Sequence, residues 1–141
     1  MDYFFVGDET TGVSALVAND RASGSLYSTV VTEKGPKCPY ALSSFISWLR
    51  ELGYPRFPLQ SDGEPALTAF VNAAREKMLE NNVGMDSIVC RFSPVGSHQS
   101  NRGAERAVGL IRGYARVYLE VIQQRTGVII NAASAWWAWV L

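Results

Sequence analysis

A chain of 141 residues is long enough for one domain with a buried core, and a composition of 48% hydrophobic and 18% charged residues excludes a disordered protein. The 13 basic and 13 acidic residues cancel, so nucleic-acid binding would need a local basic patch and not net charge. No apolar run is long enough to cross a membrane, and the first residues lack the basic and apolar regions of a signal peptide. We therefore expect a soluble, intracellular protein with no membrane partner.

Three short runs rich in aromatic and β-branched residues open the chain and predict strands. They cover Tyr3–Val6, Val13–Ala18 and Leu26–Thr32, and polar turns at Gly7–Gly12 and Asn19–Gly24 separate them. Three strands joined by such short turns predict an antiparallel meander.

Helical and strand periods alternate after Pro39. The expected elements, in chain order, are a helix at Leu42–Leu52, a strand at Phe57–Gln60, a helix at Ala66–Glu80, a strand at Ile88–Phe92, a long helix at Ser100–Gln124 and a last segment at Asn131–Leu141. A meander followed by alternating elements predicts an α/β domain over residues 1–141, with a mixed five-stranded sheet and helices on both faces.

The two cysteines, Cys38 and Cys90, have no His or Cys neighbour at the spacing of a zinc site. We interpret both as free thiols in a reducing compartment.

The long helix carries one acidic residue among arginines. Its apolar residues share one helical face and are Ala104, Ala107, Val108, Ile111, Ala115, Tyr118 and Ile122. The opposite sector holds Glu105 with Arg102, Arg106, Arg112 and Arg116. One interpretation is a solvated face with ordinary charge pairs. The other is a functional acid beside a basic track, which requires further acidic residues to converge on Glu105.

Two other acidic residues stand at predicted strand ends, where functional sites gather in open α/β sheets. Asp62 follows the strand Phe57–Gln60, although a turn acid or helix N-cap is an equally good interpretation. Asp2 begins the first strand, where a plain N-terminal polar residue is the alternative.

Taken together, these motifs resemble those of a known family. Asp2-Tyr3-Phe4-Phe5-Val6, Leu59-Gln60-Ser61-Asp62-Gly63-Glu64 and His98-Gln99-Ser100-Asn101-Arg102-Gly103-Ala104-Glu105 resemble, in order, the three acidic motifs of retroviral and retrotransposon integrase catalytic cores, the rve family. The resemblance covers nearly the whole chain and is nearest to copia-type elements. It departs from the family in a longer Asp62–Glu105 separation, absorbed near Asn81–Ser87, and in Arg102, which stands between Asn101 and Gly103.

The resemblance implies a ribonuclease H-like fold and a metal-dependent polynucleotidyl transferase for DNA 3′-end processing and strand transfer. Asp2, Asp62 and Glu105 would be the catalytic residues and the ligands of two Mg²⁺ or Mn²⁺ ions. This agrees with the chemistry, because clustered carboxylates need cations and hard oxygen ligands select these metals. Residues that would contact DNA are Gln99, Asn101, Arg102, Arg106, Arg112 and Arg116. The implied partners are element ends, target DNA and further copies of the chain, in the nucleus.

Two alternatives stay open. The first is a truncated, inactive element remnant that keeps nucleic-acid binding or self-association, because only Met1 precedes Asp2 and the Trp-rich segment Ala135–Leu141 resembles the beginning of a longer helix. The second is a ribonuclease H-like hydrolase acting alone, which would not need Gln99 and Asn101. His98 is expected to be a turn residue, and Glu64 to favour the N-terminus of the following helix.

Overall fold

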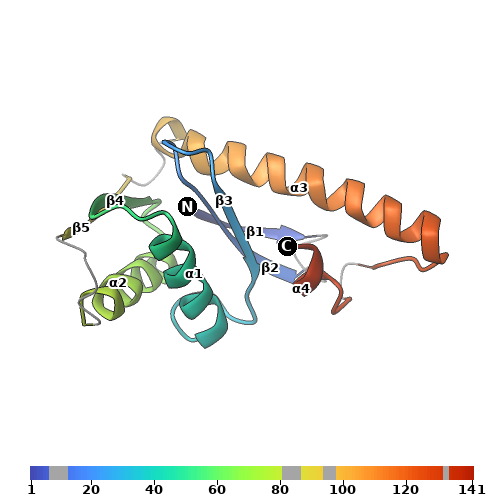
Figure 1. The fold of residues 1–141 in the computed structure, drawn as a ribbon, viewed down its shortest axis with the longest axis horizontal. Coiled ribbons are helices and arrows are strands. Elements are labelled where there is room, and N and C mark those ends of the chain that lie inside the picture. Colours follow the sequence, from blue (N-terminus) through green and yellow to red (C-terminus); the bar gives the residue numbers. More distant parts are fainter. Residues whose placement is uncertain (7–12, 81–86, 94–97, 132–133) are drawn as a thin grey trace.

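The computed structural model of the chain forms a mixed α/β fold with five strands in two sheets (Figure 1). The residues that it describes are 1–6, 13–80, 87–93, 98–131 and 134–141. The predicted turn at Gly7–Gly12, most of the expected connection Asn81–Ser87, and the residues 94–97 before the long helix lie outside this description.

The N-terminal sheet is the predicted meander. It contains β1 (Asp2–Val6), β2 (Val13–Asn19) and β3 (Leu26–Val30), in the order β1-β2-β3 with both pairs antiparallel. The register places Asp2 opposite Val17 and continues to Val6 opposite Val13, so β1 pairs along its whole length. The antiparallel meander is therefore confirmed.

The second sheet pairs β4 (Arg56–Ser61) with β5 (Ser87–Phe92) in parallel. It differs from the expected single five-stranded sheet, because among the described residues no ladder joins β1 to β4. A hydrogen bond from the Met1 ammonium to the carbonyl oxygen of Gln60, at 2.9 Å, links the beginning of β1 to β4. β1 begins beside the end of β4, so the two strands overlap too little to form a ladder.

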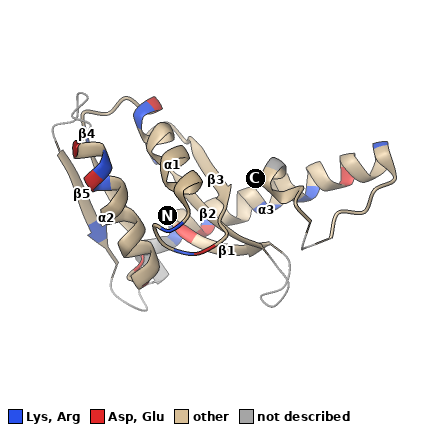
Figure 2. Cartoon of the chain, turned by 90° about the horizontal axis from the view of Figure 1, so that it is seen from below, with Lys and Arg blue, Asp and Glu red and all other residues tan. Residues whose placement is uncertain are grey.

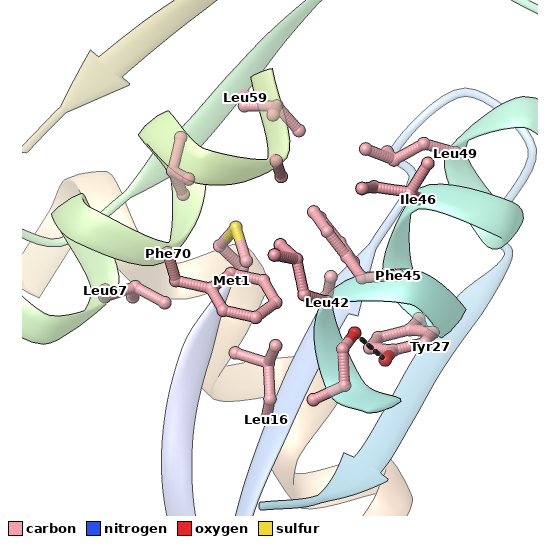
Figure 3. Close-up of a cluster of buried hydrophobic side chains, with 14 of the residues drawn as sticks. Met1, Leu16, Tyr27, Leu42, Phe45, Ile46, Leu49, Leu59, Leu67 and Phe70 are labelled. Carbon is pink, nitrogen blue, oxygen red and sulfur yellow. Dashed lines mark hydrogen bonds between the residues drawn. The ribbon is translucent and has the colours of Figure 1, made fainter. Parts of the chain in front are cut away.

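Helices α1 (Pro39–Glu51) and α2 (Pro65–Glu80) cover one side of the strands. α1 begins three residues earlier than predicted, because Pro39 suits the first turn of a helix, and Gly53 at φ +70° follows its end. Phe45 and Phe70 are fully buried between these helices and the sheet, with ring centroids 5.4 Å apart (Figure 3). Met1 belongs to the same cluster, so the first residue of the chain is part of the core.

Helices α3 (His98–Thr126) and α4 (Trp137–Val140) lie on the other face of the three-stranded sheet. Ala104, Ala107, Ile111 and Ala115 are buried there, as predicted. Tyr118 was expected to be buried and is 56% exposed, because the second half of α3 extends beyond the sheet (Figure 1). The periodicity of an apolar face shows that a helix can be buried, but not how far the sheet beneath it reaches.

The C-terminal segment packs against this second cluster through Trp137, Val140 and Leu141. Trp137 is buried and its indole N–H donates to the carbonyl oxygen of Asn131 at 3.0 Å, whereas Trp136 is 52% exposed. Cys38 and Cys90 are free cysteines, as predicted. No helix in the described part of the chain combines the length and apolar character needed to span a membrane.

We expect Phe45→Ala to lower the free energy of unfolding by about 3–5 kcal/mol, because it removes a fully buried ring that contacts Tyr27, Trp48 and Phe70. Urea unfolding monitored by circular dichroism measures the change. Tyr40→Ala is the matched control, since Tyr40 is on the same helix and 71% exposed, and it should cost much less. Equal losses in the two variants would contradict the placement of the core.

Candidate functional site

The hydrogen bond between Met1 and Gln60 joins two strand ends that are far apart in the sequence. Asp2 begins β1, and Asp62 directly follows β4. The two carboxylates lie close enough that the charge of Asp62 raises the pKa of Asp2. Of the three acidic residues predicted to converge, the structure therefore brings these two together.

Burial is the largest cause of the raised pKa of Asp2, and the charge of Asp62 comes second. Two effects lower the pKa of Asp2: the backbone N–H of Tyr3 donates to Asp2 Oδ1 at 2.8 Å, and the Met1 ammonium is a nearby positive charge. Glu64 raises the pKa further. The negative charges of Asp62 and Glu64 thus act on Asp2, and a cation bound beside Asp2 would be stabilised by them.

Asp62 also has the structural role that the sequence left open. Its Oδ1 accepts a hydrogen bond from the backbone N–H of Glu64 at 3.2 Å, so Asp62 stabilises the turn that leads into α2. Ser61, just before it, is fully buried, and its hydroxyl has no hydrogen-bond partner within the described residues. A turn role for Asp62 does not exclude a second role, because its other carboxylate oxygen is not used by that bond.

Glu64 is held by Lys34, which the sequence did not single out. The ammonium of Lys34 lies 2.8 Å from Glu64 Oε1 and 5.2 Å from the centroid of the Tyr3 ring. A lysine in the turn after β3 gives no local signal of this contact, because the two residues are 30 positions apart. The expected role of Glu64 at the helix N-terminus is therefore supplemented by an ion pair beside the two aspartates.

Glu105 does not complete the group of three. It is an exposed residue on α3, next to Ala104, which lines the same cavity as Met1 and Gln60. Among the residues that the structure describes, no three His, Cys, Asp or Glu side chains are grouped closely enough to hold a metal ion. The helix end that carries Glu105 is thus near the junction, without the carboxylate joining the aspartate pair.

The first turn of α3 differs from the predicted polar turn. α3 begins at His98, so His98, Gln99 and Asn101 are helical, although their side chains lie outside the description. Gly103 is where another element comes close: a Cβ there would lie 3.2 Å from the Nε of Arg21. Arg21 comes from the turn between β2 and β3 and was not identified from the sequence, because a turn arginine carries no pattern.

The four predicted arginines are exposed along α3, and Figure 2 shows the charged residues of this helix. They are Arg102, Arg106, Arg112 and Arg116. Arg112 differs from the others because its guanidinium donates to the carbonyl oxygen of Phe5 at 3.3 Å and lies 5.5 Å from the Phe4 ring centroid. Arg112 therefore also fastens α3 to β1.

Two of the three predicted carboxylates are placed where they could bind a hard divalent cation. Asp2 and Asp62 supply only carboxylate oxygens, which Mg²⁺ and Mn²⁺ prefer, and the charge of Asp62 raises the pKa of Asp2. The third oxygen donor expected from Glu105 is not grouped with them.

The Met1 ammonium gives this junction a pH dependence. Burial lowers its pKa from 8.0 to about 6. Below about pH 6 it is charged in both folded and unfolded chains and the full burial cost applies, whereas above about pH 8 it is neutral in both. We therefore expect the free energy of unfolding to rise by roughly 2 kcal/mol between these pH values, which urea unfolding across the range measures.

The control is the Nα-acetylated chain, which keeps an N–H for Gln60 and has no ammonium to titrate. It should lack this rise. An identical pH profile for both forms would show that the ammonium is not buried at the junction.

Comparison with known proteins adds no relative: no family model matches the chain, and no curated protein shows significant sequence similarity to it.

Proposed function

We propose that the chain is a ribonuclease H-like catalytic core of the integrase type, a Mg²⁺-dependent polynucleotidyl transferase that acts on DNA ends. The observation that carries the proposal is the pairing of Asp2 with Asp62 across the junction of β1 and β4. The two acidic residues are 60 positions apart, and the sequence motifs singled out both.

In this proposal, Asp2 and Asp62 hold a divalent ion, with Glu105 as the further ligand that the motif resemblance implies. A pair of such ions supplies an activated water or 3′-hydroxyl and stabilises the leaving oxygen of a phosphodiester. The protein contributes the position of the carboxylates. Asp2 is fixed by the Met1–Gln60 bond, and Asp62 by the turn into α2.

Glu64 has an ion-pair partner, Lys34. Glu64 pairs with Lys34 at 2.8 Å, and its charge still raises the pKa of Asp2 alongside that of Asp62, so a cation held by Asp2 and Asp62 would relieve this repulsion. We therefore assign Glu64 to supporting the local field and not to direct metal binding.

The arginines of α3 provide the proposed path for DNA. Arg102 and Arg106 lie on the same turns as Glu105, so a phosphate backbone bound by them would pass beside the proposed chemistry. Gln99 and Asn101, on the first turn of the helix, remain predicted contacts to the DNA end.

A remnant that binds DNA or itself without catalysis is the second candidate. It is favoured by the second half of α3, where Tyr114, Val117 and Tyr118 are each more than half exposed. Apolar side chains along one projecting helix are typical of a surface that contacts another molecule.

We expect the wild-type chain to give strand-transfer products from a labelled DNA end in the presence of Mg²⁺, and Asp62→Asn and Glu105→Gln to give none. Removing one carboxylate from a metal site removes both a ligand and the charge that holds the cation. Gel separation of the labelled products measures the activity.

Glu120→Gln is the matched control, because Glu120 is another exposed acidic residue of α3, which accepts a hydrogen bond from Gln124. This variant should retain full activity. Equal product from wild type and Glu105→Gln would eliminate the proposed chemistry. A wild-type chain that binds DNA and yields no product would favour the inactive remnant.

We expect Arg106→Gln and Arg116→Gln each to weaken DNA binding for all sequences alike and to reduce the slope of log K against log salt by about 0.9. Each substitution removes one phosphate contact and its released counterion. Fluorescence anisotropy at several salt concentrations gives the slope. Arg50→Gln, an exposed arginine on α1, should leave the slope unchanged, and a similar reduction there would place the DNA elsewhere.

A further inference from the structure

A cavity of about 430 Å³ lies between the end of β2, the strand β4 and the second half of α1. The described residues that line it do not include Asp2 or Asp62, so it is separate from the aspartate pair. Apolar and aromatic side chains such as Trp48, Leu49 and Tyr54 form one wall. A concave site of this size with such a wall is typical of small-molecule binding.

Two aromatic side chains of this wall are held in place by their polar atoms. The Trp48 indole N–H donates to Ser25 Oγ at 2.9 Å, and the Tyr54 hydroxyl donates to Asp20 Oδ2 at 2.8 Å. The Trp48 ring also packs on Phe45, with ring centroids 5.8 Å apart. Because their polar groups are already bonded, both side chains offer the cavity mainly ring surface, which suits a flat apolar group.

The charge of the lining is mostly positive. Of the described residues that line the cavity, Asp20 alone is acidic, and its carboxylate already accepts hydrogen bonds from Ser23 and Tyr54. Three lining residues are arginines, namely Arg21, Arg56 and Arg91. A ligand of this cavity is therefore expected to be an anion.

Arg21 and Arg91 belong to the same end of the cavity. Arg91 is the register partner of Gln60 in the β4–β5 ladder. Burial and the nearby charge of Arg21 lower the pKa of the Met1 ammonium, which donates to Gln60. Arg21 follows β2 and Arg91 is on β5, so the two arginines approach the region of Gln60 from two different walls.

Both of these arginines are available to a ligand. Between described residues, no ion pair or hydrogen bond engages the side chain of Arg21 or Arg91, and both residues are exposed. Arg56 differs from them, because it already has an interaction within the chain. Two positive charges at one end of an aromatic cavity match a head group that carries close to two negative charges, as a phosphate monoester does.

We propose that this cavity binds a small aromatic phosphate. The phosphate would lie between Arg21 and Arg91, whose planar guanidinium groups can each form paired hydrogen bonds with its oxygens. The flat apolar body would lie against Trp48 and Tyr54, where it displaces water from the rings. The site uses none of the three acidic residues of the proposed catalytic function, so it is a second site that does not depend on strand transfer.

The test measures the binding of naphthyl phosphate to the full chain by isothermal titration calorimetry, in EDTA and without DNA. We expect one molecule to bind per chain. Naphthol of the same isomer has the body without the charge, and inorganic phosphate has the head without the body. Each should bind at least about tenfold more weakly than naphthyl phosphate, because each lacks one of the two groups that the cavity recognises.

Arg21→Gln and Arg91→Gln should each weaken the binding of naphthyl phosphate about tenfold, because each removes a charge-assisted hydrogen bond. Neither should change the binding of naphthol. Arg75→Gln is the matched control, since Arg75 is an exposed arginine on α2 outside the lining, and it should leave both affinities unchanged. Circular dichroism checks that the variants, which alter exposed side chains, keep the fold.

The proposal is supported if both arginine variants, and not the control, lose affinity for naphthyl phosphate alone. It is overturned if the wild-type chain does not bind naphthyl phosphate, if naphthol binds as tightly, or if neither variant weakens binding. It is also overturned if an oligonucleotide with a terminal phosphate displaces naphthyl phosphate at lower concentration than a nucleoside monophosphate does, because the site would then belong to a DNA strand. Since Mg²⁺ and catalysis play no part, a failure here is distinguishable from a failure of the strand-transfer assay.

Discussion

The arrangement of the molecule depends on the contact of Met1 with β4. The Met1 ammonium donates to Gln60, and the Met1 side chain is buried in the cluster of α1 and α2. This is the link through which the meander reaches the second sheet, and it places Asp2 beside Asp62. The cluster of α1 and α2 also joins the sheets, because it contains Leu16 of the meander and Leu59 of the second sheet. The proposed chemistry therefore draws on this backbone junction and on the core beside it.

Two arginines lie where α3 meets its neighbours near this junction, in addition to the buried cluster that packs the helix on the sheet. Arg112 holds the helix to β1 through the Phe5 carbonyl and the Phe4 ring. At the other end, Arg21 approaches the helix at Gly103, where an added Cβ would lie 3.2 Å from the guanidinium and would require it to shift slightly. The helix end that carries Glu105 lies near Met1, because Ala104 and Met1 line the same cavity, and among the described residues the carboxylate does not join the aspartates in a group of three.

Most elements of the fold could be predicted from the sequence, because each short apolar run has a clear period. The strands of the meander, α1 and α2 follow such periods, and so does the buried face of α3 as far as Ala115. The exposure of Tyr118 could not be predicted, because it depends on where the sheet ends. The division into two sheets likewise depends on the overlap of β1 with β4, which is a relation between distant residues. The order of the motifs singled out Asp2 and Asp62 as candidate site residues. Lys34 and Arg21 could not be predicted as their neighbours, because single basic residues in turns carry no pattern.

The same junction explains why the two aspartates are close and Glu105 is not. Asp2 and Asp62 are positioned by backbone: one begins a paired strand, and the other bonds the turn that starts α2. Glu105 lies on α3, and the neighbouring Ala104 is buried and lines the cavity beside Met1. The two carboxylates that accept hydrogen bonds from the backbone are therefore the ones that the structure brings near each other, and among the described residues Glu105 is not grouped with them.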